Sequence, residues 1–342
     1  MRKIVFDLIC PYNKFDLLIV FFIAYKMDSF HEQMEEYSFP YYEQKDIKLM
    51  NIIGEGGTGT VYTGTLTILD DTLDCVIKVV NSEEYDKRHR NRFMYQDILD
   101  EVDIGRRFMN KSKHQIQFYG YSILERNDII TIYLLMERTN SNQDISTYLG
   151  LGEFWNKLTK QEYDNSKSPT KMYHQTSNTI EYWDYTMSVT DKFNLIKQLC
   201  ISIQDLHKFN VVHCDLKRDN MVYSDNIIKL IDYGASQFMD NEKEIQGSCN
   251  LGTAGYMAPE MYDGWISYKS DIYSLGVCIL EIWFGDIWPS NTNSYKKCRQ
   301  YVLNYLSLLK KDNKELHKLV QRCVSTDTKK RPLIKTVLSN LN

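Results

Sequence analysis

The sequence predicts an α+β protein built as two lobes, and three observations support this. Strand-like segments crowd into the chain before residue 137, around one helix-like segment. A polar run at 137–142 has the character of a linker. A strongly amphipathic helix at 193–207 then belongs to the second part. At 342 residues, the chain has room for two modest domains or one large two-lobed domain.

Composition narrows the class of protein. The chain is 43% hydrophobic and 25% charged, the balance of an ordinary soluble globular protein. A net charge of −4 without a concentrated basic run argues against nucleic acid as a partner. The eight cysteines form no CxxC pair, which argues against a zinc site or a disulfide framework and favours the reducing cytoplasm. Oligomeric state stays open.

An N-terminal extension at 1–45 contains one unbroken apolar run at 17–25. The run is too short for a transmembrane helix, and no small-residue cleavage site follows it. Membrane association is therefore disfavoured. A membrane anchor, a helix packed on the domain and a leader upstream of a start at Met27 all stay open.

A glycine-rich turn between two strands opens the first lobe. The segment at 47–61 predicts strand, turn and strand, with the turn Gly54-Glu55-Gly56-Gly57-Thr58-Gly59. Glycines let backbone amides approach an anion closely. Because a β-branched strand follows the turn, the pattern favours a hairpin that covers phosphates over a dinucleotide-binding crossover. A merely flexible hairpin is the alternative.

Lys78 lies in the middle of an apolar strand predicted at 75–80. A buried ammonium group needs an anion, unless the strand is an edge from which the side chain reaches water. The helix predicted at 91–109 carries Glu101 inside an apolar face, and a Lys78–Glu101 pair would satisfy both charges. Two further strands are predicted within 116–136, joined by a turn at 126–128. The other members of the helix face are Met94, Ile98, Gly105 and Phe108.

An insertion is predicted early in the second lobe. Residues 144–151 are expected to begin a helix, whereas 152–190 are polar without clear periodicity. We expect 152–190 to be a long solvated surface loop rather than a binding element. The helix at 193–207 follows, with Thr190 as its N-terminal cap and Asp191 in its first turn.

A dense group of charged residues follows that helix at 213–220. It contains Asp215, Lys217 and Asn220, and a second acid, Asp232, follows an apolar run at 227–231. An aspartate can accept a hydroxyl proton, a lysine can neutralise a phosphoryl oxygen, and Asn with Asp can bind a hard cation through oxygen. These are the parts that phosphoryl transfer requires, although so short a pattern also arises by chance in loops.

Taken in order, these segments resemble the eukaryotic protein kinases from about residue 46 to the C-terminus. The resemblance implies a bilobal protein-kinase-like fold, with a small β-rich N-lobe at about 46–137 that has one key helix. A larger, mainly helical C-lobe would occupy about 141–342 and contain the insertion at about 152–190. The motifs are Gly54, Gly56, Gly59 and Val61; Val76-Ile77-Lys78; Glu101; His213-Cys214-Asp215 to Asn220; Asp232-Tyr233-Gly234; Ala258-Pro259-Glu260; the buried-helix start Ser270 to Gly276; and Asp327 to Pro332, whose Arg331 would pair with Glu260.

The resemblance also implies a role for each site residue. Asp215 would accept and orient the substrate hydroxyl, Lys217 would stabilise the transferred phosphoryl group, and Thr253 would bridge the two. Asn220 and Asp232 would hold Mg²⁺. Lys78 would contact the α and β phosphates of ATP, Met136 would be the gatekeeper, and the backbone at 137–139 would bind adenine. The full set expected to bind ATP is Ile53, Gly54, Glu55, Gly56, Gly57, Thr58, Gly59, Thr60, Val61, Lys78, Glu101, Met136 and Glu137.

Substrate class follows from Lys217 and from the segment at 252–260, which are similar to those of serine/threonine kinases. The expected activity is therefore ATP-dependent phosphorylation of Ser and Thr hydroxyls on protein substrates, with Asp215 as the catalytic base. The alternative is a pseudokinase that acts as a scaffold or ATP-binding module without phosphoryl transfer. A kinase of small molecules with the same fold is a third reading.

Three residues depart from the family pattern. Cys214 replaces the usual arginine of the catalytic loop, so we expect activity that does not require activation-segment phosphorylation. Tyr233 replaces the usual phenylalanine of the metal-binding turn, a change that activity should tolerate. Gly105 stands where the family places a bulky apolar residue, which predicts a loosely held helix and room for an activator.

Overall fold

The computed structural model shows two compact units. Unit 1 comprises Met1–Met109 and Gln117–Arg138, and unit 2 comprises Asn110–Ile116 and Thr139–Asn342. The apolar run at 17–25, residues Gly57 and Thr58, and the helix expected at 144–151 lie outside the described residues. The structure describes residues 30–56, 59–88, 94–127, 129–139, 155–165, 172–175, 180–239, 243–247, 251–285, 287–288 and 294–341.

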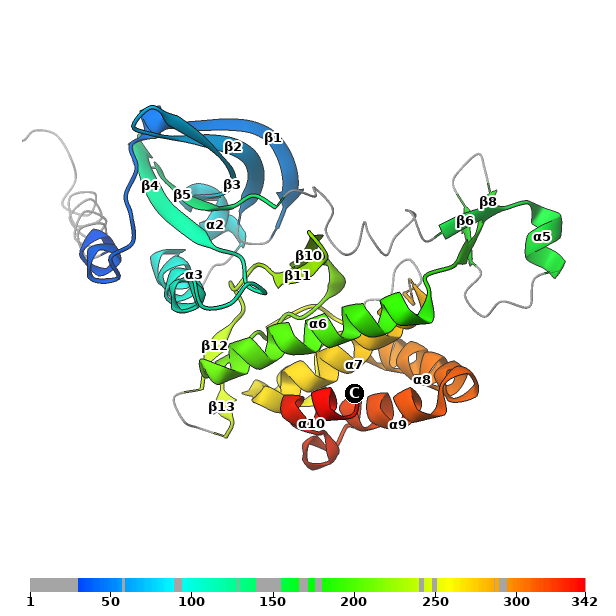
Figure 1. The fold of residues 1–342 in the computed structure, drawn as a ribbon. Coiled ribbons are helices and arrows are strands. Elements are labelled where there is room, and N and C mark those ends of the chain that lie inside the picture. Colours follow the sequence, from blue (N-terminus) through cyan, green and yellow to red (C-terminus); the bar gives the residue numbers. More distant parts are fainter. Residues whose placement is uncertain are drawn as a thin grey trace, which may run out of the picture. The chain divides into compact units, whose positions relative to one another are not determined.

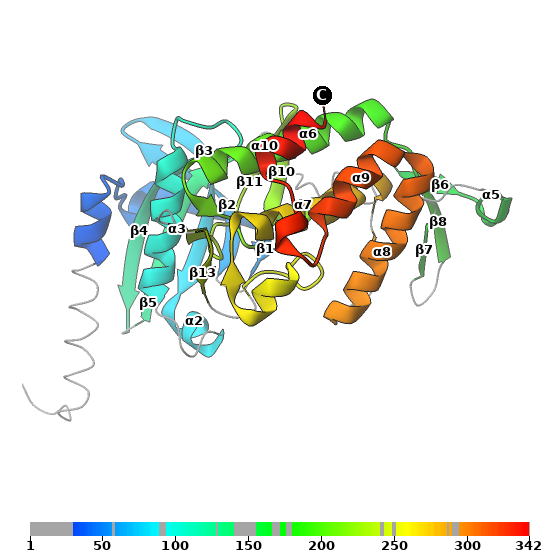
Figure 2. The same ribbon diagram turned by 90° about the horizontal axis from the view of Figure 1, so that it is seen from below.

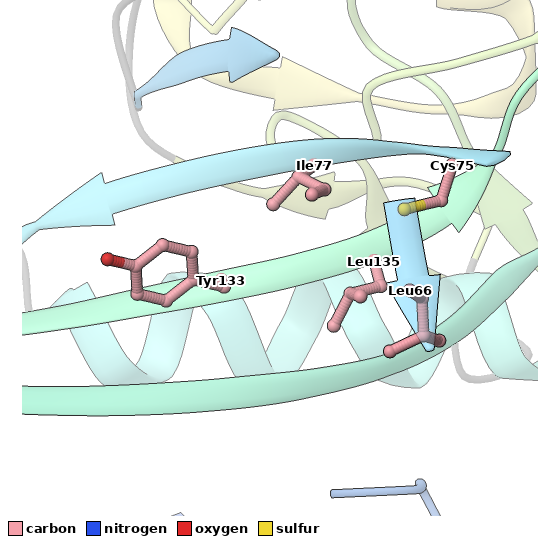
Figure 3. Packing of buried hydrophobic residues seen from close by; sticks show 5 residues of the cluster. All are labelled: Leu66, Cys75, Ile77, Tyr133 and Leu135. Atoms are coloured by element: carbon pink, nitrogen blue, oxygen red, sulfur yellow. The ribbon is translucent and has the colours of Figure 1, made fainter. Parts of the chain in front are cut away.

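Unit 1 is built on a strongly curved antiparallel sheet of five strands, in the order β1-β2-β3-β5-β4 (Figure 1). The strand at 75–80 is the second half of β3, which is flanked by β2 and β5, so Lys78 does not lie on an edge strand. Apolar side chains of three strands pack together on one face of the sheet, as Figure 3 shows for Leu66, Cys75, Ile77, Tyr133 and Leu135. The strands are β1 (Ile47–Glu55), β2 (Thr60–Ile68), β3 (Asp71–Asn81), β4 (Phe118–Arg126) and β5 (Ile129–Glu137).

Helix α3 (Met94–Phe108) is the helix expected at 91–109, and all five residues of its predicted apolar face are buried. A second helix, α2 (Ser82–Arg88), was not predicted. The chain before the sheet contributes helical residues 30–36 and the 3₁₀ turn η2 (Gln44–Asp46). The room predicted beside Gly105 is absent, because a Cβ atom placed there would lie 2.4 Å from the ring of Phe118. The space that an activator would need at Gly105 is therefore already filled by Phe118.

Unit 2 is mainly helical, with helix α7 at its centre. Every residue of α7 from Ser270 to Phe284 is buried, and α7 packs against α6, α8 and α9 (Figures 1 and 2). Helix α10 packs on α6, and α8 packs on α9. The helices are α6 (Val189–Lys208), α7 (Tyr268–Phe284), α8 (Tyr295–Asp312), α9 (Lys314–Cys323) and α10 (Ile334–Ser339).

Helix α6 begins earlier than the sequence predicted. Its N-cap is Ser188, whose hydroxyl accepts a hydrogen bond from the backbone N–H of Asp191 at 3.1 Å. Thr190 already lies inside the helix, so its assignment as the cap is wrong. Both residues have the hydroxyl that a cap needs, and periodicity alone does not fix the first turn.

The described parts of the insertion form regular secondary structure, so the expectation of an irregular surface loop at 152–190 is wrong. It contains β6 (Trp155–Leu158), α5 (Lys160–Asn165), β7 (Met172–Gln175) and β8 (Ile180–Tyr185). The three strands form an antiparallel sheet in the order β6-β8-β7. Aromatic residues favour strands, and pairing between distant segments stabilises them in a way that the periodicity of one segment does not reveal.

Short elements connect the large helices of unit 2 and carry the candidate site. β10 (Met221–Ser224) and β11 (Ile227–Leu230) form a hairpin, whereas β9 (Val211–Val212) pairs with β12 (Gln237–Phe238). β13 (Ile245–Gln246) pairs with β14 (Trp265–Ile266). The 3₁₀ turns are η3 (Arg218–Asn220), η4 (Pro259–Asp263) and η5 (Thr328–Lys330). Among the described residues, no helix combines the length and apolar character needed to cross a bilayer.

Candidate active site

Lys78 and Glu101 form a buried ion pair in unit 1. The ammonium nitrogen lies 2.9 Å from Oε1 and 2.8 Å from Oε2 of the carboxylate. The two side chains are only 7% and 4% exposed. Because neither charge is solvated, removal of one partner would leave a buried, uncompensated charge. The pair thus fixes helix α3 on strand β3.

The glycine-rich turn closes the hairpin of β1 and β2. Gly54 lies opposite Val61 and Glu55 opposite Thr60, and the N–H of Gly56 donates to the carbonyl of Gly59 at 2.9 Å. A Cβ atom on Gly59 would lie 2.5 Å from the carbonyl oxygen of Val79 on β3, so only glycine fits there. Ile53 is 53% exposed at the end of β1.

Met136 and Glu137 end strand β5. Met136 is buried opposite Val76 and Phe118 of the neighbouring strands. The backbone N–H of Glu137 donates to the carbonyl of Gln117 at 2.8 Å. A backbone contact from Glu137 to an adenine ring would therefore use its carbonyl oxygen.

Asp215 is the centre of a compact polar group in unit 2. Its Oδ2 atom lies 2.9 Å from the Lys217 ammonium group and accepts a hydrogen bond from Asn220 Nδ2 at 3.0 Å. Lys217 also donates to the hydroxyl of Thr253 at 2.7 Å. The other oxygen, Oδ1, is buried and has no hydrogen-bond partner within the described part of the chain. One carboxylate oxygen is held, and the other can accept a proton.

Gly252 keeps the space beside Asp215 clear. Its φ of +109° favours glycine, and a Cβ atom there would lie 2.5 Å from the carbonyl oxygen of Cys214. The same atom would lie 3.5 Å from Asp215 Oδ1. The segment at 252–260 therefore approaches the catalytic loop more closely than any side chain allows.

Asp271 holds the loop at 213–220, and no role was predicted for it from the sequence. Its carboxylate, 1% exposed at the start of α7, accepts the backbone N–H groups of His213 at 2.9 Å and Cys214 at 3.1 Å. Cys214 has a left-handed backbone with a φ of 67°, a conformation that costs roughly 1–2 kcal/mol for a residue with a side chain. The two hydrogen bonds to Asp271 stabilise this conformation. An acid in the first turn of a mostly apolar helix is the signal in the sequence.

Asn220 and Asp232 offer oxygen donors suited to Mg²⁺. Asn220 directly precedes strand β10, and Asp232 follows strand β11 of the same hairpin. The N–H of Ile231 donates to the carbonyl of Asn220 at 3.1 Å. Since Asn220 directs its Nδ2 group at Asp215, its amide oxygen is the side-chain atom that can bind a cation. Amide and carboxylate oxygens are ligands that Mg²⁺ accepts, so the donor set fits the metal.

Tyr233 is anchored by a hydrogen bond that phenylalanine could not make. Its hydroxyl donates to Gln115 Oε1 at 2.8 Å, and Gln115 Nε2 donates to the carbonyl of Ser202 at 2.9 Å. Ser236 is also anchored, because its buried hydroxyl donates to the carbonyl of His213 at 3.1 Å. The structure thus adds Gln115 to the residues that position the turn at 232–234.

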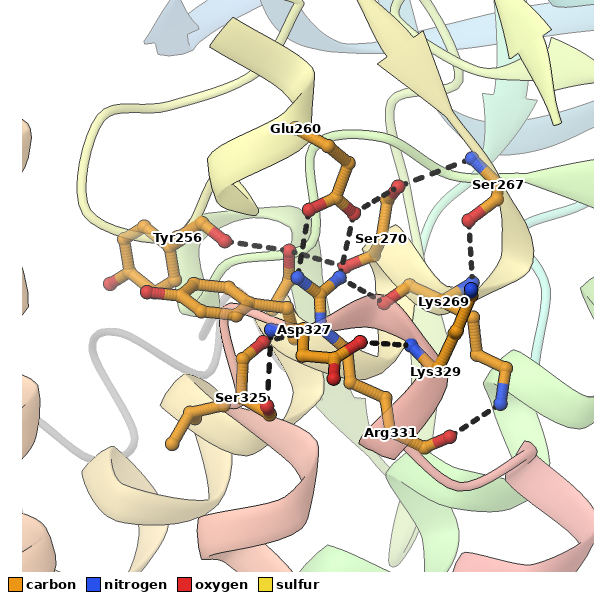
Figure 4. A network of polar contacts seen from close by, with 12 residues as sticks. Tyr256, Glu260, Ser267, Lys269, Ser270, Ser325, Asp327, Lys329 and Arg331 are labelled. Carbon is orange, nitrogen blue, oxygen red and sulfur yellow. Dashed lines mark hydrogen bonds and ion pairs between the residues drawn. The ribbon is translucent and has the colours of Figure 1, made fainter.

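Glu260 and Arg331 form an ion pair in which the Arg331 side chain is fully buried and the Glu260 side chain is 17% exposed, and Figure 4 shows the guanidinium group inside its network. Two nitrogens of Arg331 donate to the two carboxylate oxygens of Glu260, at 2.6 and 2.7 Å. Ser270 donates to Glu260 at 3.0 Å, and the carbonyl of Lys269 accepts a further bond from Arg331 at 2.9 Å. The end of the segment at 252–260 is thereby tied to the region after α9.

Comparison with known proteins identifies the family. The family model described as "Protein kinase domain" matches residues 47–341. The serine/threonine-protein kinase ppk34 of Schizosaccharomyces pombe is 22% identical over 321 residues, which are 86% of this chain and 82% of that protein. PR5-like receptor kinase of Arabidopsis thaliana is 24% identical over 256 residues, or 73% of this chain and 32% of that protein. Calcium-dependent protein kinase 6 of Plasmodium berghei is 26% identical over 222 residues, or 63% of this chain and 13% of that protein.

The chain thus spans less than two thirds of the length of the PR5-like receptor kinase and of calcium-dependent protein kinase 6. It spans most of the length of ppk34. The predicted α+β bilobal fold is confirmed, since a five-stranded antiparallel sheet forms one unit and a mainly helical part the other. ATP use is inherent to a kinase domain. The family model covers far more than half of the sequence, and the chain belongs to the protein kinase family.

Proposed function

We propose that the chain transfers the γ-phosphoryl group of ATP to Ser and Thr hydroxyls of protein substrates, with Asp215 as the catalytic base. The observation that carries this proposal is the state of the Asp215 carboxylate. One oxygen is fixed by Lys217 and Asn220, whereas the other is buried and unpartnered among the described residues. A substrate hydroxyl that donates to Oδ1 would satisfy it and be oriented for attack.

The remaining residues act by position and charge. Lys78, held by Glu101, would bind the α and β phosphates, and the glycine-rich turn would cover the phosphates with its amides. Lys217 would stabilise the transferred phosphoryl group, and Thr253 keeps Lys217 directed at the site. Asn220 and Asp232 would hold Mg²⁺, which neutralises phosphate charge when bound. No covalent enzyme intermediate is required.

We also propose that activity does not depend on a phosphorylated activation segment. Cys214 is buried and uncharged where a phosphate-binding cation is expected, and burial raises the pKa of its thiol well above the ordinary value. Ser236 is buried and bonded, so it is a poor phosphate acceptor. Replacement of Ser248 by Ala should leave transfer unchanged, and loss of transfer in that variant would contradict this part of the proposal.

A radiolabel transfer assay from ATP to a generic Ser/Thr protein substrate tests the function. Asp215→Asn and Lys78→Met should each lower the rate at least about a hundredfold, the scale of general-base and positioning effects. Asp219→Asn is a matched control, because Asp219 is exposed and only four residues from Asp215. Equal signals from the unmutated chain and both site variants would support the pseudokinase alternative. Transfer to metabolites but not to protein would indicate a small-molecule kinase.

A further inference from the structure

Residues 30–42, here called the N-terminal segment, lie against strand β4. The N–H of Tyr42 donates to the carbonyl of Tyr121, and the N–H of Tyr121 donates to the carbonyl of Pro40, both at 2.9 Å. Tyr41 and Tyr121 form a parallel β-bridge. Because β4 is an edge strand of the sheet, these bonds occupy backbone groups that would otherwise be exposed there.

Gly120 in β4 makes this close approach possible. A Cβ atom at Gly120 would lie 2.4 Å from the carbonyl oxygen of Pro40 and 2.5 Å from the ring of Tyr42. Its φ of +158° is also one that side chains rarely adopt. The N-terminal segment therefore lies so close to β4 that only glycine fits at position 120.

The segment also contacts both ends of helix α3. The ring centroid of Phe30 lies 5.4 Å from that of Tyr95 in the first turn of α3. The guanidinium group of Arg106, in the last turn, lies 4.2 Å from the ring centroid of Tyr37. Phe30 is 1% exposed, whereas Tyr95 is half-buried. Cation–π and aromatic pairs of this kind are attractive contacts, so both ends of α3 are held by the segment.

A third contact reaches the middle of α3 through Phe118. The ring of Phe118 abuts Gly105, one turn after Glu101, where a Cβ atom would lie 2.4 Å from it. Phe39 of the N-terminal segment packs on this ring and on that of Tyr121, with its centroid 6.3 Å from that of Phe118 and 6.0 Å from that of Tyr121. The bulky side chain missing from α3 is thus replaced by a ring from β4, and that ring is held by the N-terminal segment.

We infer that the N-terminal segment positions helix α3 and, through it, the Lys78–Glu101 ion pair. The segment contacts α3 on both sides of Glu101 along the helix. The two hydrogen bonds of the ion pair require that the Glu101 carboxylate oxygens stay 2.8–2.9 Å from the Lys78 nitrogen. A small displacement of α3 would break both bonds and leave buried charge unpaired. This inference rests on the proposed function, because the role of Lys78 in binding phosphates belongs to it.

The test is a double-mutant cycle in the full chain. Phe30→Ala/Phe39→Ala should lower kcat for phosphoryl transfer about tenfold, and Glu101→Gln should lower it further. If the segment acts through Glu101, the triple variant Phe30→Ala/Phe39→Ala/Glu101→Gln should have a kcat no lower than that of Glu101→Gln alone. Multiplied losses would overturn the inference. Glu32→Ala/Glu36→Ala is the matched control, since both side chains lie exposed in the same segment and should have no effect.

Hydrogen exchange separates this inference from the proposed function. In Phe30→Ala/Phe39→Ala, backbone amides of α3 should exchange faster, whereas those of α7 in unit 2 should not change. Unchanged protection of α3 would overturn the inference even if the chain transfers phosphate. If the unmutated chain transfers none, the proposed function fails and the exchange result still stands. If α7 also loses protection, the milder variant Gly120→Ala, which displaces the segment at Pro40, replaces the double variant. Its kcat and the hydrogen exchange of α3 then test the inference in the same way.

Discussion

The hydroxyl of Tyr233 should stabilise the fold rather than take part in phosphoryl transfer. Tyr233→Phe removes one donor that lies 2.8 Å from Gln115 Oε1 and 3.2 Å from the carbonyl of Leu230. Tyr233 is 1% exposed and Gln115 is fully buried, so water cannot replace the lost donor. A net hydrogen bond contributes about 1 kcal/mol, and a buried acceptor that loses its donor costs up to about 3. We expect the free energy of unfolding to fall by about 1–2 kcal/mol.

The measurement is urea unfolding of the full chain, combined with the transfer assay. Tyr223→Phe is the control, because its hydroxyl bonds to Asn226 at 3.2 Å in an exposed place, and it should change stability by less than about 0.5 kcal/mol. In a Gln115→Met background, Tyr233→Phe should cost clearly less than in the unmutated chain. Transfer activity should stay within a few-fold, since the ring and its 5.9 Å packing on His213 remain. Equal losses in the two tyrosine variants, or no coupling to Gln115, would refute this reasoning.

Three further outcomes are expected. Arg331→Lys should lower the free energy of unfolding by about 1.5–3 kcal/mol, because lysine keeps the charge but cannot reproduce the two hydrogen bonds to Glu260; thermal melts should show no such loss for the exposed-site control Lys330→Arg. Burial lowers the pKa of His114 and of His317 below the ordinary 6.5, so the folded state resists their protonation and unfolding free energy should fall as pH drops below about 6.5. A His114→Asn/His317→Asn variant with an unchanged pH slope in urea titrations would contradict this. Iodoacetamide at mildly alkaline pH should spare the described cysteines until urea unfolds the chain, since burial raises their thiol pKa values; rapid labelling of the native protein, read by mass spectrometry, would count against it. The described cysteines are Cys75, Cys200, Cys214, Cys278, Cys298 and Cys323.

The sequence was most informative where one residue had a clear physical need. A lysine in an apolar strand and a glutamate in an apolar helix face each require a counter-ion, and Lys78 and Glu101 do lie together. The same logic applies to the charged loop around Asp215, whose polar neighbours gather as expected. Local chemistry therefore predicted the members of both groups, although not their distances.

The sequence was least informative where the partner is remote and itself ordinary. Nothing about Gln115 marks it as the acceptor for Tyr233, 118 residues away. Gly105 indicates missing bulk, but the replacement by Phe118 depends on how β4 approaches α3. Strands β6, β7 and β8 likewise depend on pairing between segments that are each too short to show a pattern.

The Glu260–Arg331 pair has a consequence for the order in which the chain folds. Its partners are 71 residues apart, so during synthesis Glu260 leaves the ribosome well before the guanidinium group that neutralises it exists. Closing so long a loop is entropically costly, and contacts of this separation form late. The strands of unit 1 can pair while this carboxylate is still solvated. We therefore expect a transient species with an ordered N-terminal sheet and an activation segment that is not yet fixed.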